Sequence, residues 1–176
     1  VVEMKGITKR FPNVVANDHI DLKLRGGEVC AILGENGAGK STLMKILYGL
    51  YHADEGRIVV RGQDVSIDSP KAAIAQGIGM VHQHFALDEK LTAAENLILG
   101  TKQAKTVLNM KEIKGEVVDL SRQFGLEVDP DSKVYQLSEG MKQRIEILKT
   151  LLRGAQILVF DEPTAVLTPL ETKDLF

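Results

Sequence analysis

The chain of 176 residues has a single cysteine and no apolar run long enough to span a membrane. Cys30 has no second cysteine to pair with, so an internal disulfide is excluded, and its apolar neighbours predict a buried structural thiol. A transmembrane helix needs about 20 consecutive apolar residues, and no stretch approaches that length. No signal peptide is recognisable at the start of the chain. These absences lead us to expect a cytosolic protein.

An excess of positive charge is also absent, because the formal net charge at pH 7 is −2. Proteins that bind nucleic acid usually carry a basic surface. The balance of charge therefore gives no electrostatic case for a nucleic-acid partner, although a local basic patch remains compatible with it. The hydrophobic and charged fractions, 44% and 26%, are those of a soluble globular protein.

The most informative segment is Gly-Glu-Asn-Gly-Ala-Gly-Lys-Ser-Thr at residues 34–42. The apolar run before it predicts a strand over residues 28–33, and the pattern after it predicts a helix from about 40 to 49. G-x-x-x-x-G-K-[ST] between a strand and a helix is the pattern of a phosphate-binding loop. The alternative is a glycine-rich turn without a ligand, but chance matches to this pattern are rare.

Each part of this loop has a chemical use. Glycines let successive backbone N–H groups point into one concavity, and the helix that follows adds its own free N–H groups and the positive end of its dipole. Lys40 can reach the β- and γ-phosphates, and the Ser41 hydroxyl can ligate Mg²⁺. The predicted binding residues are Gly34, Glu35, Asn36, Gly37, Ala38, Gly39, Lys40, Ser41 and Thr42.

Strand and helix patterns alternate along the rest of the chain and predict an α/β fold. Strands are expected at residues 1–4 (ending at Gly6), 20–24, 57–61, 78–81 and 157–160. The last of these is typical of a fully buried strand in a parallel sheet. Capping signals and apolar stripes predict helices from Ser69, from Thr92, over 110–124, over 141–152 and from Thr168. Residues from about 88 to 154 are thus mainly helical, and the short final helix suggests that the domain is incomplete at its C-terminus.

Two carboxylates, Asp161 and Glu162, directly follow the strand predicted at 157–160. The carboxyl ends of strands in an open α/β sheet are where ligands bind. Asp161 would hold Mg²⁺, and Glu162 would polarise the water that attacks a γ-phosphate. Two solvated acids at a strand end are the alternative; the phosphate loop favours the catalytic interpretation.

A third motif, Leu137-Ser138-Glu139-Gly140-Met141, precedes the predicted helix over 141–152. Taken alone, it is a helix start capped by Ser138. The chain, however, contains four motifs in a fixed order: the phosphate loop, Gln83, Leu137-Ser138-x-Gly140 and residues 157–162. In this order they resemble the motifs of the nucleotide-binding domain of ABC ATPases, and the resemblance covers nearly the whole chain. The resemblance implies a P-loop NTPase core over 1–176 with a mostly parallel sheet, an N-terminal antiparallel β part and a helical subdomain at about 88–154.

The resemblance also implies roles for individual residues. Gln83 would ligate Mg²⁺ and sense a transmembrane partner, and Phe11 would stack on adenine. Ser138 and Gly140 would contact the γ-phosphate of an ATP held by a second ATP-binding domain, so that two ATP molecules lie between head-to-tail domains. Three departures matter: Glu139 and Met141 replace Gly and Gln of the usual LSGGQ motif, residues 165–168 differ from the usual SALD, and no histidine follows Glu162.

Residues 137–171 look most similar to importers of simple sugars and nucleosides. The resemblance therefore implies an ATPase that couples Mg·ATP binding and hydrolysis to solute uptake, at the cytoplasmic face of the membrane and in contact with permease subunits. One alternative is a non-transport ABC ATPase that acts on ribosomes or DNA, but no basic stretch or coiled-coil insertion supports it. Another is a GTPase or small-molecule kinase, but the Asn-Lys-x-Asp guanine motif does not occur.

Overall fold

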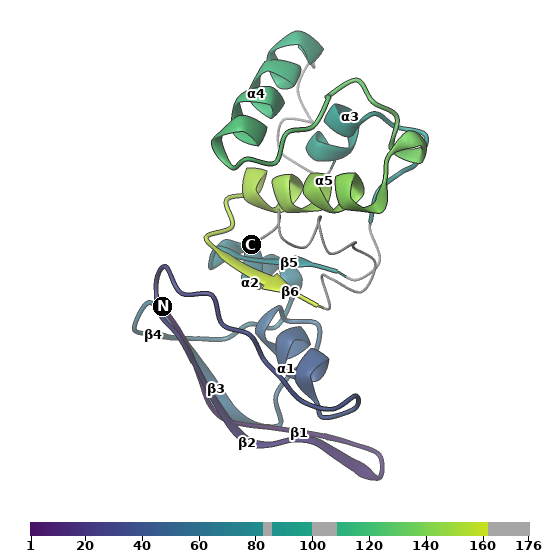
Figure 1. Ribbon diagram of the computed structural model, residues 1–176. Coiled ribbons are helices and arrows are strands. Elements are labelled where there is room, and N and C mark those ends of the chain that lie inside the picture. Colours follow the sequence, from purple (N-terminus) through teal and green to yellow (C-terminus); the bar gives the residue numbers. More distant parts are fainter. Residues whose placement is uncertain (83–85, 100–108, 162–176) are drawn as a thin grey trace. The chain divides into compact units, whose positions relative to one another are not determined.

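The computed structural model describes residues 1–82, 86–99 and 109–161, and the chain forms two compact units, Val1–Ile78 and Gly79–Phe176. Figure 1 labels the elements. The first unit contains β1 (Val2–Phe11), β2 (Val14–Leu24), α1 (Lys40–Leu47), β3 (Glu55–Val60), β4 (Gln63–Val65) and α2 (Pro70–Ala75). The second contains β5 (Ile78–Val81, starting one residue earlier), α3 (Ala93–Ile98), α4 (Met110–Gln123), a 3₁₀ turn η2 (Val134–Gln136), α5 (Glu139–Leu152) and β6 (Ile157–Phe160).

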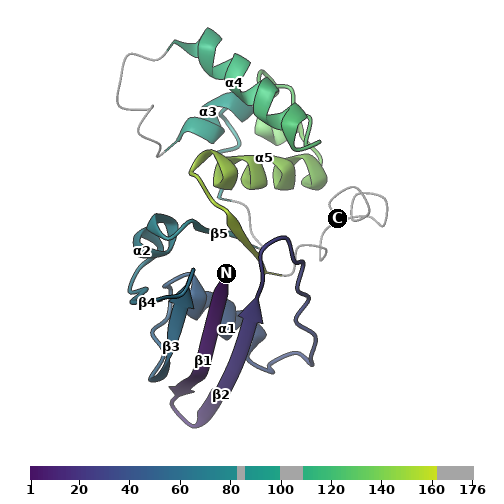
Figure 2. The same ribbon diagram turned by 90° about the vertical axis from the view of Figure 1, so that its left-hand side faces the viewer.

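The first unit is built on an antiparallel sheet with the strand order β2-β1-β3-β4. Alternate residues of β1 face the interior, and Val2, Met4 and Ile7 are fully buried there. Helix α1 lies against one face of the sheet (Figures 1 and 2) and buries Leu43, Ile46 and Leu47. This packing holds the start of α1, and therefore the glycine-rich loop before it, against the sheet.

Strand β1 is longer than the sequence predicted, because it continues through Gly6 to Phe11. The backbone of Gly6 takes a positive φ of 59°, and the register with β2 shifts between Met4 and Ile7. The Gly6 N–H donates to Asp21 Oδ1 at 2.6 Å, so its backbone donor is satisfied by a side chain. A bulge therefore replaces the expected strand end.

The strand predicted over residues 28–33 is not formed in the structure. The described chain runs from β2 to α1 without a strand (Figure 2). Val29 and Leu33 are 83% and 90% exposed. Cys30 is exposed as well, so the prediction of a buried thiol is wrong. A strand requires a neighbour that accepts and donates its backbone hydrogen bonds, and none of the described residues supplies one to this run.

In the second unit, three helices pack around one apolar cluster. Its most deeply buried members include Leu97 of α3, Val117 of α4, and Ile145 and Leu148 of α5. The apolar stripes predicted for the second and third of these helices face this cluster, with the exception of Phe124. Helix α4 ends at Gln123, so Phe124 occupies the C-cap position and is 47% exposed.

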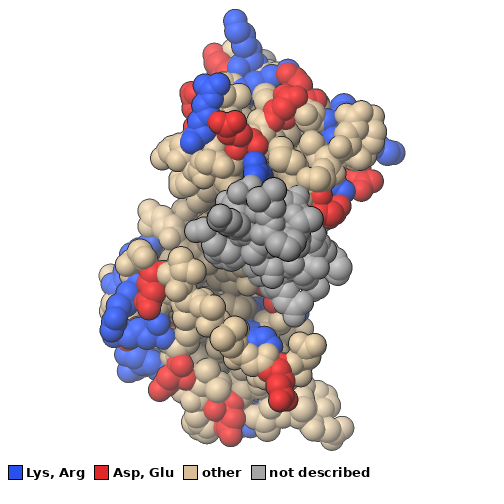
Figure 3. Space-filling model, in the orientation of Figure 1, with Lys and Arg blue, Asp and Glu red and all other residues tan. Residues whose placement is uncertain are grey.

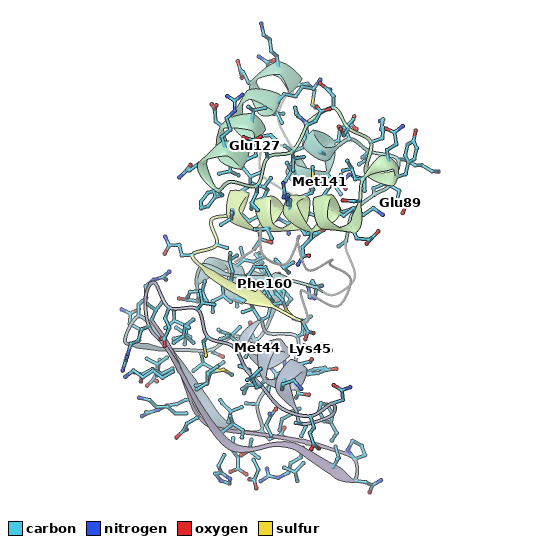
Figure 4. The ribbon with its side chains drawn as sticks, in the orientation of Figure 1. Met44, Lys45, Glu89, Glu127, Met141 and Phe160 are labelled. Atoms are coloured by element: carbon cyan, nitrogen blue, oxygen red, sulfur yellow. The ribbon has the colours of Figure 1, made fainter. Side chains whose placement is uncertain are left out.

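Strands β5 and β6 pair beside this helical part. The Asp161 N–H donates to the Val81 carbonyl at 3.2 Å, which places the carboxyl ends of the two strands side by side. The run 157–160 was expected to be fully buried, but only Ile157 and Val159 are; Leu158 and Phe160, the latter labelled in Figure 4, are partly buried. The described part of this sheet has two strands, so alternate residues lie on differently covered faces.

Local capping signals predicted three helix starts correctly. Ser69 caps α2 by accepting the Ala72 N–H at 3.3 Å. Thr92 and Glu95 form a complete capping box on α3, in which the Thr92 N–H donates to Glu95 Oε2 at 2.6 Å. That backbone N–H holds the pKa of the Glu95 carboxyl below its usual range. Ser138 caps α5 in the same way by accepting the Met141 N–H.

Helix α5 also carries a buried ion pair that ties it to the chain after residue 85. Lys149 Nζ lies 3.3 Å from Glu146 Oε1, and the two side chains are only 7% and 8% exposed. The same ammonium donates to the Ala86 carbonyl at 2.8 Å. Each buried charge therefore has a partner, and the segment that begins at Ala86 is held by α5.

Removing one member of this pair should strongly destabilise the protein. We expect Lys149→Met to cost about 3–5 kcal/mol, because the Glu146 carboxylate stays buried without its counter-ion. Chemical denaturation measures the loss. The double change of Glu146→Leu with Lys149→Met removes both charges and should recover most of it; a double variant as unstable as the single one would contradict this account.

Candidate phosphate site and signature helix

The glycine-rich loop adopts a curled conformation closed by its own lysine. Gly37 and Gly39 have φ angles of 83° and 86°, which side chains rarely tolerate. The Ala38 N–H donates to the Glu35 carbonyl at 3.2 Å, which closes a turn within the loop. Lys40 Nζ donates to the carbonyl oxygens of Gly34 and Glu35, at 2.7 Å in each case.

Helix α1 starts without a side-chain cap. Its N-cap residue is Gly39, which has no side chain to accept a hydrogen bond from the first turn. The N–H groups at a helix start are left unpaired by the helix itself. An anion can accept hydrogen bonds from such N–H groups, and the dipole of the helix favours one at this end.

Phe11, the predicted adenine-stacking residue, ends β1 at the rim of the sheet. Its ring meets the Tyr51 ring edge-on, with centroids 5.5 Å apart and an interplanar angle of 74°. The Lys9 ammonium lies 5.6 Å from the Phe11 centroid. Phe11 is partly exposed, so it is not an ordinary core residue. No sequence motif pointed to Tyr51, because the contact joins residues 40 positions apart.

Asp54 anchors the end of the strand that carries Phe11. Its Oδ2 accepts the Arg10 N–H at 2.6 Å, and its Oδ1 accepts from Lys9 Nζ at 2.9 Å. The Arg10 backbone N–H first, and then the Lys9 ammonium, hold the pKa of the Asp54 carboxyl below its usual range. The Phe11 ring is therefore positioned by its contact with Tyr51 and by the hydrogen bonds of Asp54 to the two residues before it.

In the second unit, residues 137–141, here called the signature segment, form the start of α5, here called the signature helix. The Ser138 side chain accepts the Met141 N–H at 3.3 Å, and Gly140 is buried. Figure 4 labels Met141, which packs against the apolar cluster. A glutamine in the usual motif is thus replaced here by a residue that contributes to the core.

The unusual carboxylate of this segment, Glu139, has a cationic partner. Lys142 Nζ lies 2.9 Å from Glu139 Oε1, one helical turn away. The same ammonium is 4.0 Å from Glu89 Oε1, labelled in Figure 4. Lys142 thus offsets part of the negative charge that Glu139 adds near the helix start. The sequence contained this pair at i, i+3, a spacing that predicts such contacts.

The catalytic carboxylates predicted after β6 are only partly within the described residues. Asp161 is described, and its backbone places it at the carboxyl end of β6, beside the end of β5. Gln83 and Glu162 lie outside the described residues. The phosphate loop belongs to the first unit and Ser138, Gly140 and Asp161 to the second, and each unit is described by itself.

Within residues 1–82, 86–99 and 109–161, no three His, Cys, Asp or Glu side chains gather as a metal cluster. No helix in the same ranges is both long and apolar enough to cross a bilayer. On the face drawn in Figure 3, Lys and Arg side chains are interspersed with Asp and Glu on each unit.

The loop geometry and the signature helix agree with the family comparison. The model of the ABC transporter family matches residues 17–165. The chain belongs to that family. The prediction made from the four ordered motifs is thereby confirmed, and with it the P-loop NTPase fold, which solved ABC cassettes share.

Among curated relatives, the guanosine import ATP-binding protein NupO of Bacillus subtilis is 56% identical over 176 residues, which is 99% of this chain and 34% of that protein. The ribose import ATP-binding protein RbsA of Caldanaerobacter subterraneus is 47% identical, over all of this chain and 36% of its own length. The chain therefore spans about a third of the length of the relatives it matches.

Solved structures have the same fold. The ADP conformation of MJ1267, an ATP-binding cassette of an ABC transporter, superposes with a TM-score of 0.85 at 27% identity and covers 99% of this chain and 73% of that one. The dimeric ABC transporter cassette MJ0796 gives a TM-score of 0.79 at 26% identity, over 99% of this chain and 79% of its own.

The cap of α5 provides a test of the signature segment's local structure. Ser138→Ala removes the acceptor for the Met141 N–H and should lower the free energy of unfolding by about 1 kcal/mol. Ser138→Asp keeps an acceptor and should recover most of this loss. Thermal unfolding of both variants measures the difference, and equal melting temperatures for Ser138→Ala and the unmodified protein would show that the cap does not contribute.

Proposed function

We propose that this chain is the ATP-binding and ATP-hydrolysing part of an ABC importer, and that it couples Mg·ATP turnover to the uptake of a nucleoside or simple sugar. The main observation that supports ATP binding is the curled loop over residues 34–42, in which Lys40 contacts the loop backbone and after which α1 starts without a side-chain cap. Relatives named for the import of guanosine and of ribose support the solute class.

The loop fits a triphosphate through its own chemistry. It presents backbone donors, one ammonium and two hydroxyls, and the Lys40 ammonium already lies within hydrogen-bond distance of two loop carbonyls. In the proposed complex, Lys40 exchanges these carbonyls for β- and γ-phosphate oxygens, which are stronger acceptors because they are charged. The proposed site consists of Gly34, Glu35, Asn36, Gly37, Ala38, Gly39, Lys40, Ser41 and Thr42. In the same complex, Phe11 stacks on the adenine.

A magnesium ion also fits the residues proposed to hold it. Ser41, Gln83 and Asp161 all offer oxygen ligands, which hard cations prefer. Mg²⁺ is commonly held by one or two protein oxygens together with substrate phosphates, so a dedicated metal cluster is not required. When bound, the ion would neutralise charge that develops on the phosphates. Glu162 is the proposed general base that accepts a proton from the attacking water.

The signature helix would complete a second, neighbouring ATP site. Ser138 and Gly140 start a helix of 14 residues, so its N-terminus presents both N–H groups and a positive dipole end to a γ-phosphate. The dimeric cassette among the similar structures supports such pairing of two ATP-binding domains. The ion pair between Lys142 and Glu139 reduces the repulsion that a free Glu139 carboxylate would exert.

The remaining partners follow from this role. We propose that permease subunits form the solute pathway, that the chain binds them peripherally at the cytoplasmic face of the membrane, and that nucleic acid is not a partner. Within 1–176, residues 88–154 would form the helical subdomain, with Gln83 just before it as the sensor of the permease.

Lys40→Ala tests the phosphate site. Loss of two charge-assisted hydrogen bonds to phosphate should lower ATP affinity about a hundredfold or more, as measured by calorimetry on the intact protein. Lys23→Ala is the control, because Lys23 lies on β2 and pairs with Glu3 at 2.7 Å instead. Unchanged ATP binding by Lys40→Ala would refute the phosphate site.

Glu162→Gln tests the general base. The amide cannot accept the proton, so phosphate release by the intact protein should fall by about 10²- to 10⁴-fold. ATP binding should persist, and the variant should accumulate as an ATP-bound dimer in size-exclusion chromatography. Turnover at the rate of the unmodified protein would remove Glu162 from this role.

A further inference from the structure

Asn17 of β2 is buried against the phosphate loop, although no motif includes it. Its side chain is in the interior, with the residue only 5% exposed. The Asn17 Nδ2 group donates to the Gly39 carbonyl at 3.2 Å. This bond links the sheet to the last glycine of the loop, 22 positions further along the chain.

The Gly39 carbonyl does not require Asn17 for a hydrogen-bond partner. The Gly39 carbonyl already accepts the Leu43 N–H at 2.9 Å, as the first hydrogen bond of α1, so Asn17 is its second donor. The Asn17 Oδ1 atom is buried and has no hydrogen-bond partner in the part of the chain that the structure describes. A buried acceptor without a partner costs free energy, and an apolar side chain of similar size would avoid that cost.

The bond acts on a peptide group that belongs to the phosphate site. The peptide between Gly39 and Lys40 is planar, so fixing the Gly39 carbonyl also fixes the direction of the Lys40 N–H on its opposite side. That N–H stands at the uncapped start of α1. Gly39 also lies close to the backbone of β2, because a Cβ on it would be only 2.0 Å from the Ala16 carbonyl oxygen.

From these contacts we infer that Asn17 is a positioning residue for phosphate binding: it orients the Gly39–Lys40 peptide so that the Lys40 N–H faces the nucleotide phosphates. The inference rests on the proposed ATP site at residues 34–42. It explains why a polar side chain occupies a buried position at which its Oδ1 atom has no partner among the described residues.

The test compares phosphate affinity with stability in Asn17→Leu. In competition against a fluorescent ATP analogue on the intact protein, the ratio of ATP affinity to AMP affinity should fall about three- to tenfold, the effect of one lost hydrogen bond. The melting temperature should stay level or rise, because the unpaired Oδ1 is removed. Asn17→Ala, which cannot clash with its surroundings, should show the same fall in the ratio even if its cavity lowers the melting temperature.

Asn96→Leu is the matched control. Asn96 is also fully buried, but both ends of its amide are used: Oδ1 accepts the Asp88 N–H at 2.8 Å, and Nδ2 donates to the Asp88 and Thr92 carbonyls. Its replacement should lower the melting temperature and leave the ATP-to-AMP ratio unchanged.

The outcomes separate this inference from the proposed function. An unchanged ratio in both Asn17 variants, or an equal fall in Asn96→Leu, would overturn the role of Asn17 while the ATP site stands. Failure of the unmodified protein to prefer ATP over AMP would instead refute the ATP site. A lower ratio with an undiminished melting temperature in Asn17→Leu supports the positioning role.

Discussion

The phosphate loop depends on the close approach of Gly39 to strand β2. With a φ of 86° and the Ala16 carbonyl directly behind it, this position excludes any side chain. The hydrogen bond from Asn17 to the Gly39 carbonyl joins the same strand to the end of the loop, directly before α1. Lys40 then reaches back to two loop carbonyls, so the loop is closed by contacts of its own. Preorganisation of this kind lowers the cost of ordering donors around an anion.

The signature helix is organised by charge as well as by packing. Lys142 lies near both Glu139 and Glu89, and Lys149 pairs with Glu146 in the interior while it holds the Ala86 carbonyl. A carboxylate and a thioether at two motif positions are therefore accommodated by neighbours: Glu139 by Lys142, and Met141 by the apolar cluster. Both departures from the usual motif are therefore compatible with the surroundings of the helix.

Predictions that used only neighbouring residues were the accurate ones. Ser69, Thr92 and Ser138 cap the helices that they were expected to start, because a cap joins atoms three residues apart. Predictions that relied on burial were less accurate. The run 28–33 and Cys30 are exposed, and Phe124 turns out of the core at a helix end. Burial depends on a partner element, and an apolar sequence does not specify which element that is.

The sequence by itself determined the family, from four ordered motifs, and the place of the glycine-rich loop, because glycine spacing, lysine and hydroxyl are local properties of nine consecutive residues. It also determined most helix starts and the apolar stripes of α4 and α5. Only the tertiary structure decided that β1 continues past Gly6, that Phe11 meets Tyr51 and that Asn17 supports Gly39. Each of these features depends on residues that are far apart in the chain, and no periodicity or motif predicts which distant residues come into contact.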